Sequence, residues 1–400
     1  MHTALCPCAA LSRFRGRMAL SALFVLLLLS VWSLPGHAEE GAFSAATRTA
    51  DADPADTETA DTETADTAVP TPDAEEKVVH LSARETGTLI VYFENDLFGG
   101  TDQYYTNAVR VTAISPDLVN WAETGNLPDA LDDVIMSLPF AGDKDALYNV
   151  SLSMGQAIFT PTDTQARGLQ EDDRPYAGFL YGAVGLHAKK GNRLDTLEFT
   201  LGMVGPWALG ETAQNEVHSL RKIKTAKGWD NQLHNEPGVM VTWERTWRLN
   251  DELRSRGWEW DVLPHAGVTA GNVMTLANTG VELRYGWNLP TDFGTSLIRT
   301  GAGVGAPTND DDPRVNQDWG AYVFLGGAGR AVARNIFLDG NTFRHSHHVE
   351  KHPFVGDLSG GIAFLINGWR IAYTHVYRSE EFVGQERGQH FGSVQVSYSF

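Results

Sequence analysis

The feature of this chain that most limits its fold is an alternation of apolar and polar residues with a period of two, which recurs from residue 87 to the end. In one such run, Val281, Leu283 and Tyr285 alternate with charged or small residues. Period-two alternation is typical of a β-strand with one apolar and one polar face. No long apolar pattern with the 3.6-residue period of a helix occurs in this part of the sequence. We therefore predict an all-β fold.

Two architectures would place such strands differently. In a water-soluble sandwich the apolar faces pair in a core, whereas in an outer-membrane barrel they face lipid and the polar faces line the lumen. The chain has 11 Trp and 11 Tyr, several of them at strand ends. Its runs are about ten residues long, enough to span a bilayer when tilted. The last run alternates up to Phe400, which resembles the carboxy-terminal signature of bacterial outer-membrane proteins. We therefore predict a transmembrane β-barrel in the outer membrane of a Gram-negative cell.

Counting the alternating runs predicts twelve antiparallel strands joined by long extracellular loops. The predicted strands are 87–95, 104–114, 147–158, 176–188, 193–204, 238–248, 257–270, 279–289, 318–331, 354–366, 369–378 and 389–400. A short run at 335–340 is a thirteenth candidate. Because single-chain bacterial barrels have an even number of strands, we place this run in a loop. The barrel domain is expected to span residues 85–400.

The residues before the barrel predict export. Three arginines precede the apolar run 18–32, and Gly36 and Ala38 provide small residues for cleavage. We expect a cleaved signal peptide at 1–38, because the apolar run is shorter than the roughly 20 residues of a membrane-spanning helix. Both cysteines lie in that segment, so no disulfide is expected in the mature chain. Residues 39–84, rich in Asp, Glu, Thr and Ala, are expected to form a disordered acidic leader.

Oxygen-bearing side chains collect at the turn between the first two predicted strands. Asn95 and Asp96 end the first strand, and Tyr105 and Thr106 open the second after a pair of glycines. If both chain termini are periplasmic, this turn lies on the extracellular side. Carboxylate, amide and hydroxyl oxygens at one turn are suitable ligands for a hard cation. The alternative interpretation is an ordinary polar hairpin loop.

Because successive antiparallel strands cross the membrane in opposite directions, the connections between them alternate between the extracellular and the periplasmic side. The segments 159–175, 205–237 and 332–353 are expected to be extracellular, and 290–317 is expected to be periplasmic. We interpret the acidic run at 310–312 as part of a solvated loop, with a cation site as the alternative. The histidines in 332–353 have no regular spacing, so we interpret them as solvated, again with metal binding as the alternative.

The long connection 205–237 contains a helical pattern. Ala213, Val217 and Leu220 lie on one stripe, and Gln214 and His218 lie one turn apart on a neighbouring face. A neutral histidine can take a proton from water near neutral pH, which suits hydrolysis by an activated water. No serine occurs in a G-x-S-x-G motif and no H-E-x-x-H pair is present, so a serine elbow and a zinc-protease site have no support.

Six ordered motifs resemble one family. They are FEND with TDQYYTN, DDRPYAG, GPWALGETAQNEVH, KGWDNQLHNEP, RNIFLDGNTF and the final QVSYSF. Together they are similar to the lipid A 3′-O-deacylase (LpxR) family of outer membranes over residues 87–400. The resemblance implies a twelve-stranded barrel with a Ca²⁺-dependent esterase site at its outer rim. It implies His218 as the base, Asn95 and Thr106 as further catalytic residues, and Asp96 beside the metal.

The residues also suggest how a substrate would be held. Basic residues follow His218, where deacylases of the family have an acidic residue, and Arg221 and Lys224 are candidates for gripping lipid phosphates. Tyr105, Arg174 and Gln214 are further candidates for substrate contacts. The expected partner is lipid A, or lipopolysaccharide, of the outer leaflet, and we expect a monomer. A net charge of −19 argues against nucleic acid.

Two other functions fit the same fold. One is a calcium-dependent outer-membrane phospholipase, which would use a serine nucleophile; Ser219 is adjacent to His218 in sequence. The other is a non-catalytic barrel or channel. A channel needs an open lumen, whereas inward-facing Glu244, Glu282, Arg284 and Arg370 could instead form a salt-bridged interior.

Overall fold

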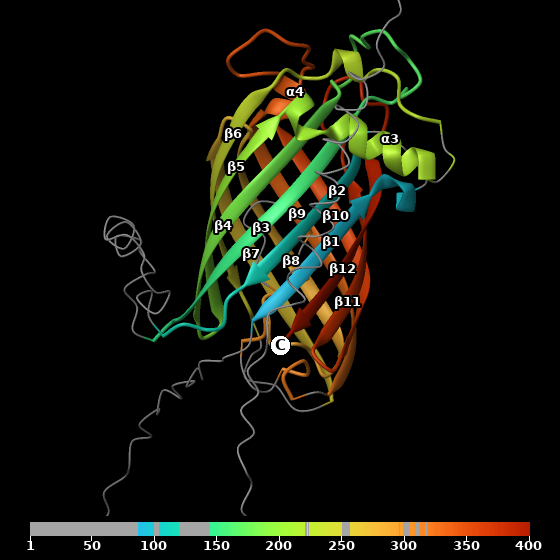
Figure 1. The fold of residues 1–400 in the computed structure, drawn as a ribbon. Helices are drawn as coiled ribbons and strands as arrows, with labels where there is room; N and C mark the ends of the chain where they lie inside the picture. The colour runs from blue at the N-terminus through green and yellow to red at the C-terminus, as the bar shows by residue number, and fades with distance from the viewer. Residues whose placement is uncertain are drawn as a thin grey trace, which may run out of the picture. The chain divides into compact units, whose positions relative to one another are not determined.

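The computed structural model describes residues 87–99, 104–119, 145–220, 222, 224–249, 257–295, 297–298, 305–308, 312–316 and 318–400. Within them, twelve strands form one closed antiparallel barrel, in which β1 pairs with both β2 and β12 (Figure 1). The strands are β1 Thr88–Asn95, β2 Tyr104–Ile114, β3 Leu147–Thr160, β4 Ala177–Lys190, β5 Arg193–Val204, β6 Glu236–Trp247, β7 Trp258–Gly271, β8 Met274–Trp287, β9 Trp319–Asn335, β10 Phe354–Ile366, β11 Trp369–Arg378 and β12 Gln389–Ser399. The predicted fold class is confirmed.

The predicted strands agree with the observed ones within about two residues at most ends. The clearest difference is β8, which begins at Met274 and not at 279, because its first residues lack apolar alternation. The run 335–340 forms the end of β9 and a short helix, α4 (Ile336–Asp339). The expected signal peptide and acidic leader lie outside the described residues.

Alternating residues of each strand face the two sides of the barrel wall, which is the closed sheet of twelve strands. In β11, Arg370, Ala372 and Thr374 are buried inside the barrel, whereas Trp369 and Ile371 are 40% and 51% exposed on its outer face. The lumen contains buried ion pairs such as Arg110–Glu198, at 2.5 Å. An apolar outer face and a polar, ion-paired lumen are the arrangement that a bilayer requires.

Aromatic residues cluster on the outer face near the end of the barrel that carries the carboxy terminus. The rings of Trp258 and Tyr285 stack at 5.3 Å, and those of Trp287 and Trp319 stack at 6.1 Å. Aromatic side chains at this level are suited to the boundary between lipid and water. Among the described residues, no helix is long and apolar enough to cross a membrane.

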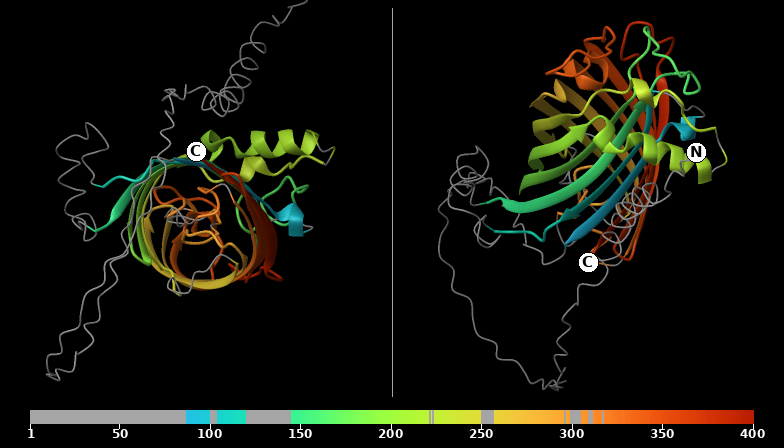
Figure 2. Two further views of the ribbon diagram at one scale, coloured as in Figure 1. Left: turned by 90° about the horizontal axis from the view of Figure 1, so that it is seen from below. Right: turned by 45° about the horizontal axis from the view of Figure 1, so that its top comes forward.

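The connection between β8 and β9 folds into the lumen, where its described residues form a plug (Figure 2, left). Asp292 is fully buried and accepts hydrogen bonds from Arg284 at 2.6 Å, Arg370 at 2.7 Å and Arg314 at 2.9 Å. Arg284 and Arg370 project from the wall, whereas Arg314 belongs to the same connection as Asp292. These ion pairs fasten the plug to two strands.

The plug corrects one sequence prediction. Asp312 is fully buried and pairs with Arg314 at 2.8 Å, so the prediction of a solvated acidic run is wrong for this residue. Residues 310 and 311 lie outside the described part. A buried carboxylate needs a cationic partner, which Arg314 supplies. The local sequence pattern does not reveal that this connection folds into the lumen, where Arg284 and Arg370 of the wall bind Asp292 beside it.

Candidate functional site

The helix α3 (Gly210–Leu220) lies outside the ring of strands, against the wall at the end opposite the carboxy terminus (Figures 1 and 2). Its start touches β4 closely: a Cβ on Gly178 would meet Ala208 and Gly210 at 3.1 Å. A Cβ on Gly210 would likewise meet the ring of Trp229 at 2.8 Å. Glycine at both positions therefore lets the helix begin in direct contact with the strand.

The buried face of α3 is polar and not the apolar stripe. Gln214 and His218 are both 4% exposed, whereas Val217 is 38% exposed. The Gln214 side-chain oxygen accepts a hydrogen bond from the Trp229 indole at 2.9 Å, and Trp229 packs with Ile158 and Tyr176 between helix and wall. Gln214, predicted to contact substrate, is better explained as a support that fixes the helix to the barrel.

His218 has a defined tautomer in its neutral form. Its Nδ1 lies 2.8 Å from the main-chain oxygen of Lys224. A carbonyl oxygen only accepts, so Nδ1 carries the proton and donates. The lone pair of the neutral ring is then on Nε2, which is the atom that can accept a proton.

The helix is long enough to carry His218 from β4 toward β1. A rise of about 1.5 Å per residue moves the chain about 12 Å between Gly210 and His218. Neighbouring strands are about 4.8 Å apart, so this distance crosses roughly two and a half strands. The helix packs on β3 and β4, and in Figure 1 it runs from there toward the turn after β1.

A β-bulge turns Thr106 to the outer face near the start of β2. The register between β2 and β3 shifts between Tyr105 and Asn107, so Thr106 is the extra residue. Its hydroxyl lies 2.7 Å from that of Thr160, which shares the outward row of β3 with Met154 and Ile158. Both threonines are buried although they face away from the lumen, which is expected if α3 and its flanking loops cover them.

Asn95 and Asp96 lie where β1 ends. Asn95 follows the outward row of Phe93, pairs in register with Asn107, and is 4% exposed. Asp96 is fully buried and begins the short helix η2 (Asp96–Gly99). This turn passes so close to β12 that a side chain on Gly99 would collide with the backbone of His390. Asn95, Asp96 and Thr106 therefore occupy adjoining strand ends, and α3 lies on the outer side of the same barrel wall (Figure 2).

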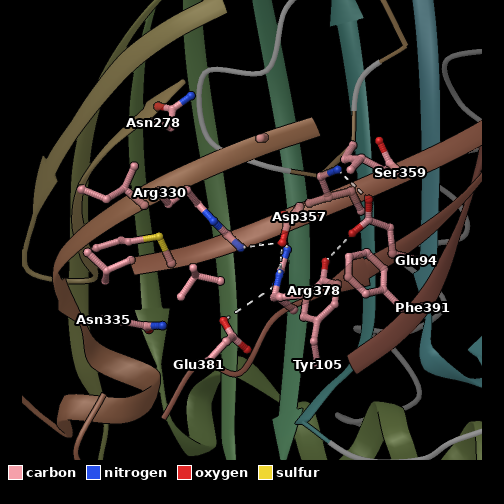
Figure 3. A pocket seen from close by; sticks show the side chains of 18 of the residues that line it. Glu94, Tyr105, Asn278, Arg330, Asn335, Asp357, Ser359, Arg378, Glu381 and Phe391 are labelled. Carbon is pink, nitrogen blue, oxygen red and sulfur yellow. Dashed lines mark hydrogen bonds and ion pairs between the residues drawn. The ribbon is translucent and has the colours of Figure 1, made fainter. Parts of the chain in front are cut away.

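Tyr105 faces the opposite way. Its ring lies inside the barrel against Phe159 and Phe391, and its hydroxyl donates to Glu94 at 2.7 Å (Figure 3). Glu94 also accepts from the main-chain N–H of Ile298 in the plug, at 2.6 Å. Tyr105 was predicted to contact substrate, but this placement makes it a support behind Thr106.

A further support was not predicted from the sequence. The side-chain amide of Gln389 accepts from the N–H of Tyr105 at 3.2 Å and donates to its carbonyl at 3.0 Å. Gln389 thereby pairs the main-chain N–H and carbonyl of Tyr105, which lie beyond the last residue pair of β1 and β2. Its position opposite the bulge follows from barrel closure, so no local sequence signal could have identified it.

The three basic residues predicted to contact substrate are Arg174, Lys224 and Arg221, and they do not share one location. Arg174 is 1% exposed; it donates to Glu381 at 3.2 Å and its guanidinium lies 4.9 Å from the Phe159 ring, so it packs in the mouth of the barrel. Burial lowers the pKa of Arg174, and Glu381 opposes that shift. Lys224 is exposed beside the site, and Arg221 lies outside the described residues.

A separate cavity of about 220 Å³ lies inside the barrel (Figure 3). Its lining combines aromatic and aliphatic residues with the ion pairs of Asp357 to Arg330 and Arg378, at 3.0 and 2.9 Å. The lining includes Glu94 and Tyr105 but not Asn95, Asp96, Thr106 or His218. The candidate site is therefore on the outer face of the wall, not in the lumen.

The donor atoms at the candidate site are hard. Asp96 supplies a carboxylate, Asn95 an amide oxygen and Thr106 a hydroxyl, which are the ligand types of Ca²⁺. Within the described ranges, no three His, Cys, Asp or Glu side chains gather in a way that could hold a metal. A Ca²⁺ site here would thus have few charged ligands. Of the loop histidines, His347 lies 2.7 Å from the carbonyl of Asp173 and joins two loops.

Comparison with known families identifies this barrel. The family model described as outer membrane protein LpxR matches residues 60–400. The chain belongs to the LpxR family. Because LpxR proteins are outer-membrane proteins by that description, the family assignment agrees with the apolar outer face of the barrel and with an outer-membrane location.

One solved structure supports the LpxR fold. LpxR from Salmonella typhimurium superposes with a TM-score of 0.62 at 16% identity, covering 78% of this chain and 99% of that one. The β domain of the Bordetella autotransporter BrkA gives a TM-score of 0.37 at 9% identity, covering 79% and 99%. At identities this low, the likeness to the Salmonella protein concerns the fold alone. No curated protein matches the chain.

Proposed function

We propose that this LpxR-family protein is an outer-membrane lipid esterase that removes an acyl chain from lipid A by 3′-O-deacylation. The observation that carries the proposal is the burial of Asp96, His218, Asn95 and Thr106 on the outward side of a barrel wall. Ionisable side chains on the lipid side of a membrane protein are costly, so they are expected to mark a functional site. The motif resemblance to lipid A deacylases supports the substrate.

The proposed reaction begins with a proton transfer to His218. Nε2 accepts a proton from water, and the water oxygen attacks the ester carbonyl carbon. The tetrahedral intermediate collapses by breaking the bond to the sugar oxygen, and His218 returns the proton to that oxygen. The products are a fatty acid and a free hydroxyl. The Lys224 carbonyl keeps the ring oriented.

Two neighbours are suited to stabilising the oxyanion. The Asn95 side-chain amide has two N–H donors, and the hydroxyl pair of Thr106 and Thr160 has two hydrogens, of which their mutual bond uses one. When bound at Asp96, Ca²⁺ would polarise the ester carbonyl and add charge stabilisation. With few charged ligands in reach, we expect binding in the weak range of about 10⁻⁴ to 10⁻³ M.

The two alternatives have less support. A phospholipase would need a serine beside His218, but Ser219 is exposed on α3 whereas His218 is buried. A channel would need an open lumen, and the described plug residues, fastened by Asp292, occupy it.

The test is the mass of lipid A from cells that express the parent or His218→Ala. We expect the parent to release one acyl chain and the variant to lose about 10² to 10⁴ of the rate, the contribution of a general base. His234→Ala is the matched control, because His234 is exposed in the same connection between β5 and β6. Near-parental activity of His218→Ala would contradict the assignment.

A further inference from the structure

Two histidines lie side by side on the outward face of the barrel, apart from the proposed catalytic residues. Nε2 of His375 in β11 and Nδ1 of His390 in β12 are 3.2 Å apart. Their ring centroids are 5.4 Å apart, with 32° between the ring planes. His390 is exposed and His375 is half-buried. Both rings are therefore accessible from outside the protein.

The pair is located near the rim. His390 is the second residue of β12 and pairs in register with Tyr377, one residue before the end of β11. The same face holds Tyr373, whose hydroxyl is 3.5 Å from Nδ1 of His375. Side chains at this level of a barrel meet the lipid headgroups and water, where dissolved ions are available.

We propose that His375 and His390 bind a borderline transition-metal ion such as Zn²⁺ or Co²⁺. Zinc binds histidine nitrogen at about 2.0–2.1 Å in tetrahedral geometry, so two ligand nitrogens are expected roughly 3.3–3.4 Å apart. The observed 3.2 Å is close to this separation. Imidazole nitrogens favour such ions, whereas the oxygen donors around Asp96 favour Ca²⁺.

Metal binding requires a change of tautomer and a rotation of the two rings, so that both lone pairs meet at the ion. In the metal-free pair, one nitrogen must donate its proton to the other. If His375 moves its proton from Nε2 to Nδ1, then Nε2 presents a lone pair and Nδ1 donates to the Tyr373 hydroxyl oxygen. In that arrangement His390 already presents a lone pair at Nδ1, whereas in the opposite arrangement the change of tautomer occurs at His390. Tyr373 thereby orients the ring of a metal ligand, as partners of ligating histidines commonly do.

The remaining coordination positions would be filled by water or by an anionic group such as a phosphate. The site would lie beside η2, because the Phe98 ring packs against Tyr373 at 5.8 Å. A side chain on Gly392 would also collide with Phe98. The proposal does not depend on the esterase reaction, since its evidence is the geometry of β11 and β12.

The test uses the purified full chain in detergent, without an affinity tag. Co²⁺ is titrated and followed by its visible absorption, and Zn²⁺ binding is measured by calorimetry. We expect His375→Ala and His390→Ala each to weaken binding at least about ten-fold, and Tyr373→Phe to weaken it less, since it removes only an orienting partner. Both histidines are accessible, so heat-modifiable gel migration should confirm that the variants remain folded.

Two control variants separate this site from others. His345→Ala with His348→Ala removes two exposed loop histidines and should leave the affinity unchanged. Asp96→Ala tests for binding at the proposed Ca²⁺ site and should also have no effect. The proposal is overturned if the parent binds neither ion. It is equally overturned if binding survives in both His375→Ala and His390→Ala, or if it is lost in either control.

Discussion

Asp292 is expected to make a large contribution to the stability of the barrel through the plug. Asp292→Asn keeps the shape of the side chain and removes its charge. Of the three arginines that it contacts, Arg284 retains Asp261 at 2.5 Å and Arg314 retains Asp312 at 2.8 Å. Arg370 retains, among its described contacts, the carbonyl of Gly294 at 3.3 Å. The substitution therefore leaves one buried guanidinium, that of Arg370, without a carboxylate among its described hydrogen-bond partners.

The expected loss of unfolding free energy follows from the one arginine that loses its carboxylate partner. Removing one partner of a buried ion pair destabilises a protein by about 3–5 kcal/mol, because the other charge remains buried. We expect about 3 kcal/mol for Asp292→Asn, the lower end, because the amide oxygen can still accept a hydrogen bond. The measurement is guanidinium unfolding of the purified barrel in detergent, with single-channel recording in planar bilayers as a second readout for release of the plug.

A surface pair provides the control for Asp292→Asn. Asp339 and Lys351 pair at 2.8 Å, and both side chains are about one-fifth exposed. Pairs of this kind contribute up to about 1 kcal/mol, so Asp339→Asn should have a small effect. If Asp292→Asn is no more destabilising than Asp339→Asn, the plug is not held as we argue. Large, steady conductance in the parent protein would also contradict a plugged lumen.

Four other predictions concern pH, metal, support and substrate. Burial raises the pKa of Asp292, but Arg370, Arg314 and Arg284 outweigh this effect and hold the pKa below its usual range. The difference in unfolding free energy between the parent and Asp292→Asn should therefore be constant from about pH 8 to 5 and shrink below about pH 4. Unfolding of both proteins at each pH measures this difference. Asp96→Ala and chelation of Ca²⁺ should each abolish lipid A hydrolysis, and full turnover in excess chelator would refute a metal role. Gln389→Leu should lower kcat more than it raises KM, whereas Gln389→Glu should retain more activity because it can still accept from the Tyr105 N–H; equal losses in both variants would argue against positioning. Lys224→Gln, with Arg221→Gln, should weaken binding of phosphorylated lipid A but leave hydrolysis of a small neutral ester unchanged, and equal losses on both substrates would show that these residues shape the site.

The sequence by itself determined the strands of this protein. Alternation with period two is a local property, since successive side chains of a strand point to opposite faces, and a bilayer enforces it over the whole span. The bounds predicted for β2, β5, β10 and β11 accordingly agree with the observed ones. The alternation was weak at the start of β8, where Asn278 faces the lumen and small residues intervene, and there the prediction began too late. The prediction for β9 ended at 331, whereas the strand continues to Asn335.

The direction of the site residues was decided by the tertiary structure. Tyr105 and Thr106 are neighbours in one motif, yet the bulge turns one into the lumen and the other to the outer face. Asp312 pairs with Arg314, two residues away, but both are buried because Asp292 binds Arg314 and also Arg284 and Arg370 of the barrel wall. Gln389 reaches Tyr105 only because β12 closes the barrel. Such contacts join residues up to 284 positions apart, and no local periodicity carries information about them. The sequence could therefore indicate which residue types gather near one rim, but only the closed barrel decides which of them face outward together.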